Sequence, residues 1–221
     1  MPSNDDTHRS EMELYKTEER ILQAAIRVFS RRPVSEATIR MVAQEAGLIH
    51  TIIVYHYKNK DRLYQAVFDR VMGGLTRFYE SWYDEVKKKK KIERDEAKKI
   101  LVEFTGHIMD LFYGSSPVSG SNKIILFEMY YPSKFTDYFY EKHYKRIYEI
   151  WSDLVMIATG KRNVVNATFL VVNIFGLLSS FRMEREMMTK HIGLVGFSKE
   201  ETEKMKKMVV KNMLLLIDGN S

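Results

Sequence analysis

The segment spanning residues 17–64 constrains the fold of this chain most, because helical apolar stripes alternate there with clear helix ends. Its first apolar stripe has the three- and four-residue spacing of one helix face and comprises Ile21, Ala24, Ala25, Val28 and Phe29. Pro33 lacks a backbone N–H and ends that helix. Thr38 suits the N-cap of a second helix, and Gly47 allows the positive φ of a sharp turn after it. The segment therefore predicts a helix followed by a helix–turn–helix pair, whose second helix covers residues 48–57.

The predicted second helix of the pair has two chemically distinct sides. Its β-branched residues at 52–54 favour a strand locally, but packing against helical neighbours can override that preference. At about 100° per residue, the side facing the preceding helices holds Ile49, Ile53 and Tyr57. The opposite side offers a hydroxyl, a methyl surface, a phenol and a cation, from Thr51, Val54, Tyr55 and Lys58. Such groups contact base edges and phosphates in protein–DNA complexes.

Three strings in this segment, ILQAAIRVF, TIRMVAQEAG and YHYKNKDRLYQAV, resemble the N-terminal DNA-binding domain of the TetR family of transcriptional regulators. The resemblance implies that the second helix of the pair enters the major groove of double-stranded DNA. Asn59 is expected to cap the next helix, whose first N–H groups and Lys60 would bind a phosphate. The residues expected to contact DNA are Thr38, Arg40, His50, Thr51, Val54, Tyr55, His56, Lys58 and Lys60.

The segment departs from the usual family pattern at positions that would read bases. The family usually has a small polar cap, a Gly or Pro, a Thr and an aromatic residue where this chain has Ile49, Thr51, Ile52 and Val54. The operator sequence therefore cannot be inferred from family habit. Alternatives stay open for three residues: His56 as a helix-packing histidine, and Arg40 and Lys60 as ordinary solvated cations.

The whole chain predicts an all-α fold, in which an N-terminal three-helix helix–turn–helix domain precedes a larger helical ligand-binding and dimerisation domain. Residues 1–16 are polar and predict a flexible arm, residues 17–64 form the DNA-binding domain beginning at Thr17, and residues 65–221 form the second domain. Further helices are expected up to residue 85 and over residues 95–113, 121–130, 133–159, 163–182 and 198–217. The clearest loop is GSSPVSG at 114–120, and Ser198 with Glu201 predicts a capping box.

By the same resemblance, the second domain is expected to hold a small-molecule effector and a homodimer interface. Aromatic and polar side chains at helical spacing are the candidate effector ligands, although such residues are more often simple core: Phe104, His107, Phe112, Phe127, Tyr130, Tyr138, His143, Trp151, Phe169 and Asn173. The expected dimer interface combines helices 163–182 and 198–217. Its apolar candidates are Val171, Ile174, Leu178, Met208, Met213, Leu215 and Leu216. Dimerisation would set two reading helices about 34 Å apart on a pseudo-palindromic operator.

Composition and missing motifs narrow the function classes. The chain has no cysteine, no phosphate-binding loop, no nucleophile-elbow motif and no zinc-protease motif, and its six histidines lack metal-ligand spacing. We therefore expect no enzyme activity, metal site or cofactor. The absence of an apolar leader and the formal charge of +6 fit a cytoplasmic protein that binds nucleic acid. The apolar stretch at 164–181 approaches the length of a membrane span, but its Asn, Gly and Ser residues favour a buried or subunit-facing helix.

These observations predict a homodimeric DNA-binding regulator, in which a small, largely apolar effector releases a repressor from its operator. The alternative is a helical protein–protein interaction module that has lost DNA binding. Ile52 and Val54, apolar on a surface expected to be polar, favour that alternative. A strong dependence of DNA affinity on salt would separate the two, because phosphate neutralisation releases counterions.

Overall fold

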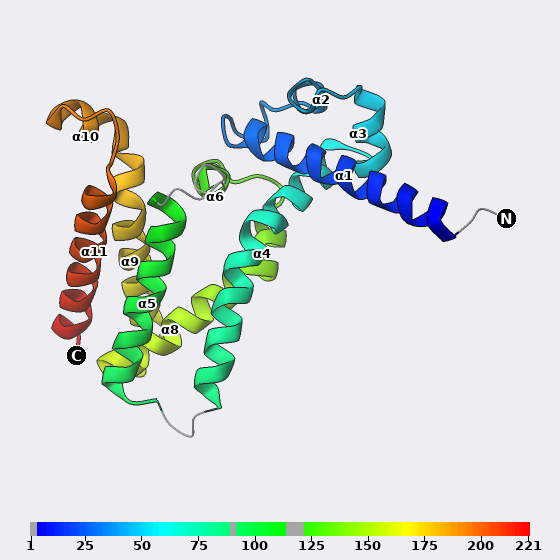
Figure 1. Cartoon of the computed structure of the whole chain (residues 1–221). Helices are drawn as coiled ribbons and strands as arrows, with labels where there is room; N and C mark the ends of the chain where they lie inside the picture. The colour runs from blue at the N-terminus through cyan, green and yellow to red at the C-terminus, as the bar shows by residue number, and fades with distance from the viewer. Residues whose placement is uncertain (1–3, 89–91, 114–121) are drawn as a thin grey trace. The chain divides into compact units, whose positions relative to one another are not determined.

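The computed structural model describes residues 4–88, 92–113 and 122–221, and within these ranges every regular element is helical (Figure 1). The all-α prediction is confirmed. The elements in chain order are α1 (Asn4–Phe29), α2 (Ile39–Ala46), α3 (His50–Tyr57), α4 (Lys60–Lys87), α5 (Arg94–Tyr113), α6 (Asn122–Tyr130), α7 (Thr136–Phe139), a π-helical turn (Tyr140–Tyr144), α8 (Lys145–Thr159), α9 (Val164–Met183), α10 (Arg185–Ile192) and α11 (Lys199–Gly219). The predicted loop at 114–120 lies outside the described residues.

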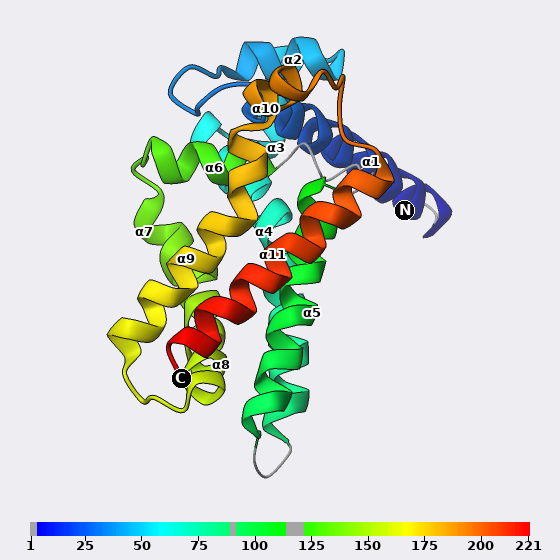
Figure 2. The ribbon, with the colours of Figure 1, turned by 90° about the vertical axis from the view of Figure 1, so that its left-hand side faces the viewer.

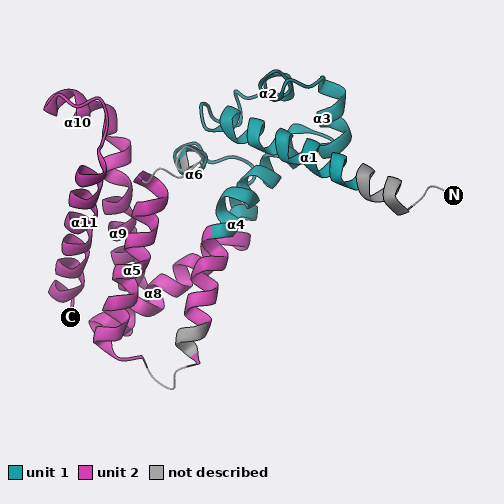
Figure 3. Cartoon of the chain, viewed as in Figure 1, with its two compact units in different colours: residues 1–74, 120–139 teal, residues 75–119, 140–221 magenta. Residues whose placement is uncertain are grey.

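The helices gather into two compact units (Figure 3). The first contains residues 1–74 and 120–139, and the second contains residues 75–119 and 140–221. The boundary differs from the one predicted after residue 64, because α4 continues the first unit to Gly74 and because α6 and α7 contact the N-terminal part of α4. The first unit therefore contains the helix–turn–helix together with part of α4 and the helices α6 and α7.

The first unit is built around α1, whose apolar stripe is buried as predicted: Ile21, Ala24, Ala25, Val28 and Phe29. Helix α1 packs on α2, and Glu45 of α2 accepts hydrogen bonds from Arg27 at 2.7 Å and Arg31 at 2.9 Å. These two guanidinium groups lower the pKa of the Glu45 carboxyl. Helix α1 begins at Asn4, within the segment expected to be a flexible arm, and the Thr17 hydroxyl donates to the carbonyl oxygen of Glu13 within the helix.

Local capping signals in the sequence are confirmed by the structure. The Thr38 hydroxyl accepts the N–H of Met41 at 3.2 Å, and Gly47 ends α2 with φ of 61°. The Asn59 side chain accepts the N–H of Arg62 at 2.9 Å at the start of α4. Ser198 and Glu201 form both bonds of the capping box that opens α11. Each signal is local, which explains why the sequence alone predicted it.

Helices α6 and α7 are joined to α4 through a buried carboxylate. Glu128 is almost fully buried and accepts four hydrogen bonds: from the Tyr64 hydroxyl, the Ser133 N–H, the Ser133 hydroxyl and the Thr136 hydroxyl, at 2.8 to 3.0 Å. Beside it, the rings of Phe68 and Phe139 stack with centroids 3.6 Å apart. These contacts explain why α6 and α7 belong to the first unit.

The second unit is a helical bundle in which α8 packs on α5 and α9, and α11 packs on α5, α8 and α9 (Figure 2). Trp151 lies at its centre, fully buried, with the rings of Phe104, Phe175 and Tyr79 within 6.1 Å of it. Ion pairs join α11 to α5 at its edges, from Lys98 to Asp218 at 2.6 Å and from Lys206 to Asp110 at 2.9 Å. Aliphatic side chains around this aromatic cluster fill the rest of the interior.

Two features of the second half differ from the predicted elements. The single helix expected over 133–159 is divided into α7, the π-helical turn and α8. Helix α10 was not predicted, because its sequence REMMTKHI has no clear apolar periodicity. A π turn holds one more residue than an α turn, and such turns are rare outside functional or strained positions.

Candidate nucleic-acid interface and effector region

Helix α3 turns one side into the first unit and the other toward solvent. Ile53 and Tyr57 are buried, as predicted, whereas His50, Thr51, Tyr55 and Lys58 are exposed, with Tyr55 reaching 74% exposure. Val54 and His56 are half-buried, and His56 lies edge-to-face on Tyr55 with ring centroids 5.4 Å apart. The structure therefore gathers the predicted α3 contact residues at or beside one solvent-facing side.

Ile49 departs from its predicted position. The helical wheel placed it beside Ile53 and Tyr57, but it is 67% exposed, because it is the N-cap of α3 and its backbone is extended. Its side chain makes no capping hydrogen bond, since it has no polar atom. The N-terminal end of α3 thus presents an additional apolar side chain that the wheel assigned to the core.

Tyr57 fixes the inner side of α3 to α1. Its hydroxyl donates to a carboxylate oxygen of Glu18 at 3.3 Å. Burial, reinforced by the charge of Glu18, raises the pKa of Tyr57 well above its ordinary value. A neutral phenol in this position is a hydrogen-bond donor and a core side chain, and it holds α3 in a fixed orientation.

The Lys60 side chain makes two hydrogen bonds within the first unit that the sequence did not indicate. Its ammonium donates to the carbonyl oxygen of Val34 at 2.8 Å and to that of Ala37 at 3.0 Å. These bonds connect the start of α4 to the loop before α2, so two of its three N–H donors already serve the fold. Lys60 thereby positions the helix–turn–helix, which differs from its expected role as a dedicated phosphate ligand.

Two further predicted DNA contacts lie at the start of α2, and a third, Lys58, lies at the end of α3. Arg40, in the first turn of α2, is exposed, as is Thr38, although the Thr38 hydroxyl oxygen is engaged in capping. Lys58 ends α3 with φ of 61°, a left-handed value that is uncommon for a residue with a side chain. Its backbone N–H bonds the carbonyl oxygen of Val54 at 2.8 Å. The strained backbone holds the exposed Lys58 side chain at the end of the helix.

The residues predicted to bind the effector do not all lie in the same unit. Phe127, Tyr130 and Tyr138 belong to the first unit, where Tyr130 is exposed and the Tyr138 hydroxyl donates to Asp69 at 2.9 Å. The second unit holds Phe104, His107, Phe112, His143 and Trp151. Phe169 and Asn173 point outward: both are exposed on α9, so their assignment to an interior pocket is corrected. Helical spacing alone could not distinguish an inner from an outer aromatic residue.

Within the second unit, two of the predicted residues lie in a tightly packed aromatic cluster. Phe104 and Trp151 are fully buried together with Tyr79. The Tyr79 hydroxyl and the Trp151 indole N–H have no hydrogen bond of ordinary geometry within the described part of the chain. Burial raises the pKa of Tyr79, with a smaller opposing effect from Trp151. Two polar atoms therefore lie inside an apolar cluster, and the sequence analysis missed Tyr79.

His107 and His143 occupy different environments. The His107 ring stacks on Phe78 with centroids 3.7 Å apart, and desolvation lowers its pKa against an opposing effect from Asp110. His143, in the π-helical turn, is buried, and its Nδ1 lies 3.2 Å from the Thr76 hydroxyl. Among the described residues, no group of three or more His, Asp or Glu side chains could hold a metal ion.

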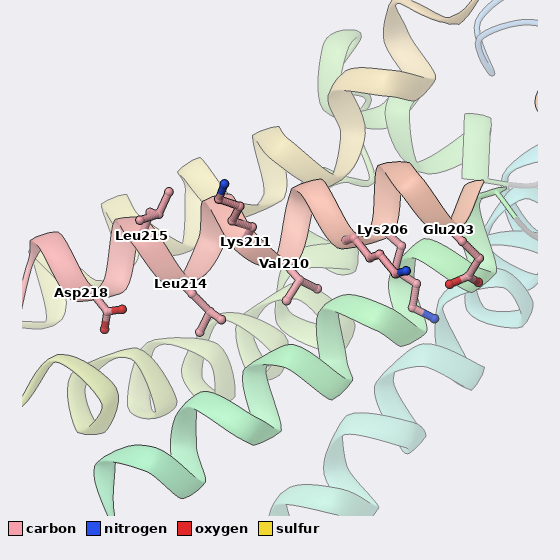
Figure 4. A pocket seen from close by; sticks show the side chains of 8 residues that line it. Glu203, Lys206, Val210, Lys211, Leu214, Leu215 and Asp218 are labelled. Carbon is pink, nitrogen blue, oxygen red and sulfur yellow. The ribbon is translucent and has the colours of Figure 1, made fainter. Parts of the chain in front are cut away.

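A groove of about 500 Å³ lies on the surface of α11 (Figure 4). Every residue that lines it belongs to α11, so it is an open hollow along one helix and not an enclosed cavity. Its apolar lining residues are Val210, Leu214 and Leu215, with Glu203 near one end of the helix and Asp218 near the other. A groove of this kind fits a packed side chain from another helix.

Helix α9, next to α11 (Figure 2), exposes apolar side chains. The expected interface residues Val171, Ile174 and Leu178 are instead buried inside the unit, as is Met213 of α11. The exposed apolar residues of the two helices are Val164, Val165, Phe169, Val172, Met183, Met208 and Leu215, a set called the outer apolar face below. Helix α9 is also long and apolar enough to cross a membrane, and only 22% of that window is buried.

Comparison with protein families identifies both halves of the chain. Residues 21–67 match the model described as bacterial regulatory proteins of the tetR family. Residues 97–220, more than half of the chain, match the C-terminal domain of the HTH-type transcriptional dual regulator CecR. The chain belongs to the TetR family of transcriptional regulators. The predicted resemblance is confirmed and extends into the second unit.

Individual relatives of this TetR-family protein are similar over limited lengths. It is 36% identical over 61 residues to the HTH-type transcriptional regulator TtgR of Pseudomonas putida, and equally to the probable regulator ArpR of the same species. These matches span 28% of this chain and 29% of each relative. Most of this chain and most of each relative lie outside these matches.

Solved structures share the fold of this TetR-family protein over most of its length. The regulator FadR of Bacillus subtilis, solved with stearoyl-CoA, has a TM-score of 0.63 at 17% identity and covers 91% of this chain and 98% of its own. SmeT, the repressor of a Stenotrophomonas maltophilia multidrug efflux pump, has a TM-score of 0.60 at 16% identity, with 89% and 88% covered. At these identities the likeness concerns the fold alone.

Proposed function

We propose that this regulator is a homodimeric, cytoplasmic repressor that binds a pseudo-palindromic operator and is released by a small, largely apolar effector. The carrying observation is the solvent-facing side of α3, held by Tyr57 and Ile53 within a TetR-type helix–turn–helix. Its exposed polar groups and the neighbouring cations Arg40 and Lys58 suit base edges and phosphates. The remaining proposed DNA contacts are Thr38, His50, Thr51, Val54, Tyr55 and His56.

The outer apolar face supports the dimer. Seven apolar side chains of α9 and α11 are at least half exposed in the monomer, and one of them, Leu215, also lines the α11 groove. Exposed apolar patches of this kind mark interaction surfaces. A two-fold dimer uses the same patch twice and would present two copies of α3 to successive major grooves. An apolar helix covered by its own copy also accounts for the low burial of α9 without a membrane.

The aromatic cluster around Trp151 supports an effector site in the second unit. A small apolar ligand that separates these rings could bond the Tyr79 hydroxyl or the Trp151 N–H, which lack ordinary partners among the described residues. Effector binding would weaken DNA binding only through its preference for the non-binding conformation. The stearoyl-CoA bound by FadR gives a first class of compounds to screen, together with other apolar carboxylates and their thioesters.

The first test is fluorescence anisotropy with the full-length protein, the DNA upstream of its own gene and a scrambled duplex, over a salt series. Repressor function predicts selective binding whose affinity falls steeply with salt. Lys58→Gly should weaken binding about tenfold at low salt and lower the salt slope by about 0.9 for each phosphate that Lys58 neutralises. Glycine suits the positive φ of residue 58, so the variant should remain as stable as the parent.

The control is Lys161→Gly, which removes the same charge from an exposed loop position in the second unit. Equal losses in both variants would reduce the effect to net charge and contradict a contact at Lys58. The rival function, a helical module that binds another protein, predicts weak binding, equal on both duplexes, with little dependence on salt. That result, together with no enrichment from a random-sequence DNA pool, would overturn the proposed function.

A further inference from the structure

The recognition helix lacks the side chains that usually distinguish bases. Helix α3 has the sequence HTIIVYHY, with no Arg, Lys, Asn, Gln, Asp or Glu. Bidentate hydrogen bonds to guanine use Arg or Lys, bidentate bonds to adenine use Asn or Gln, and cytosine is read by an acidic side chain. Direct readout by α3 therefore depends on single hydrogen bonds and on apolar contacts.

Apolar groups dominate the end of α3 that would meet the bases. In helix–turn–helix proteins, residues near the N-terminus of the recognition helix reach the base edges. Here Ile49 is 67% exposed, Thr51 is exposed and presents a methyl group, and Val54 is half-buried one turn further along. The apolar group that B-DNA offers in its major groove is the C5-methyl group of thymine.

We propose that this regulator recognises its operator mainly through thymine methyl groups, which Ile49, Thr51 and Val54 contact in the major groove. The proposal rests on the proposed DNA-binding function and specifies the kind of sequence that α3 reads. Each half-site then has two or more thymines at the positions facing α3. His50 and Tyr55 add single hydrogen bonds, which restrict base identity less than bidentate pairs do.

The charges around α3 favour DNA over a protein as the occupant of this surface. Arg40 and Lys58 are exposed at the start of α2 and at the end of α3, on either side of the apolar groups in the sequence. No acidic residue lies in α3. Cations that border a short apolar stripe match a groove whose floor carries methyl groups and whose edges carry phosphates.

The test uses a duplex enriched from a random-sequence pool by the full-length protein, so that no operator has to be known in advance. Each thymine in the enriched half-sites is replaced by uracil, which removes the methyl group and keeps every base-pairing atom. We expect affinity to fall about fourfold per contacted methyl, which corresponds to about 0.8 kcal/mol. Replacing purines by their 7-deaza analogues, which removes an acceptor, should change affinity less.

A double-mutant cycle then assigns the contact to a residue. Thr51→Ser removes the side-chain methyl and keeps the hydroxyl, whereas Thr51→Val keeps a methyl and removes the hydroxyl. We expect the Ser variant to lose sensitivity to uracil at one thymine, and the Val variant to keep it, because coupling appears only between groups in contact. Val54→Ala should lose sensitivity at a different thymine.

The outcomes separate the proposal from the function on which it rests. Failure to enrich any sequence would overturn the DNA-binding function itself. Enrichment of a sequence whose affinity is unchanged by uracil, or falls more with 7-deaza purines, would retain the function and overturn methyl readout. Uracil effects that are identical in the parent, Thr51→Ser and Val54→Ala proteins would also overturn it, because they would reflect DNA shape and not these contacts.

Discussion

The two units of this regulator differ in the contacts that join their helices and in the side chains that they leave exposed. In the first unit, polar side chains close the connections between helices, as Lys60 does with two loop carbonyls and Glu128 with four donors. In the second unit the interior is apolar, with aliphatic side chains around the rings of Phe104 and Trp151, and α9 leaves apolar side chains exposed to solvent. Among the described residues, apolar side chains are thus left exposed on α9 of the second unit, which is the surface on which the proposed dimer depends.

The largest expected effect is on the stability of the first unit and tests the hydrogen bonds that Glu128 accepts. Glu128→Ala removes the acceptor of four buried or partly buried donors, and unsatisfied buried donors each carry a penalty. We expect the free energy of unfolding to fall by about 3 kcal/mol, measured by urea denaturation with circular dichroism. Glu36→Ala, at an exposed position of the same unit, is the control and should change it by less than about 0.5 kcal/mol. A similar small change for both would mean that the carboxylate does not stabilise the unit.

The next effect is on dimerisation and tests whether the exposed apolar residues of α9 lie in the dimer interface. Phe169 is 62% exposed on α9, so Phe169→Glu should scarcely disturb the monomer but should place a charge inside a dimer. We expect the dimer dissociation constant to rise at least about tenfold, measured by sedimentation equilibrium. Tyr15→Glu changes a similarly exposed aromatic residue of α1 and should leave the dimer intact. An unchanged dimer in the Phe169 variant would place the interface elsewhere.

The smallest expected effect is on the pH dependence of stability, through His107 of the second unit. Desolvation lowers the pKa of His107 below its ordinary value of 6.5, so the unfolded chain binds this proton more readily than the folded protein does. The contribution of neutral His107 to the free energy of unfolding is therefore fully present above pH 6.5, and it is lost as the pH falls below that value. His107→Gln should flatten this part of the stability curve, measured by urea denaturation between about pH 7.5 and pH 5.5. His191→Gln, at an exposed position of the same unit, is the matched control variant.

The sequence predicted the first unit better than the second, and particular residues show why. Thr38, Gly47 and Asn59 act within three or four residues of their own position, so their roles can be read from local pattern. Lys60 bonds residues 23 and 26 positions away, and no local signal marks those carbonyls. Ile49 was misplaced because a wheel assumes a continuous helix, whereas a cap residue has an extended backbone.

The second unit was less predictable because helix periodicity does not specify which neighbours cover a helix. Helix α9 is apolar on nearly all sides, so the pattern could not separate Ile174, which is buried, from Phe169, which is exposed. Tyr130 and Tyr138 have the composition of pocket residues but belong to the unit that contains the helix–turn–helix. Only the tertiary contacts assign these side chains.

The π-helical turn has a consequence for how this sequence can change in length. Tyr138 and His143, five positions apart, both contact α4, through Asp69 and Thr76. A π turn closes its hydrogen bond over five residues, whereas in a regular α-helix the directions of two side chains five positions apart differ by about 140°. Deleting one residue between them would let the helix become regular but would shift every later residue of α8 by one position. Homologues that keep both contacts should therefore show insertions and deletions outside residues 139–142.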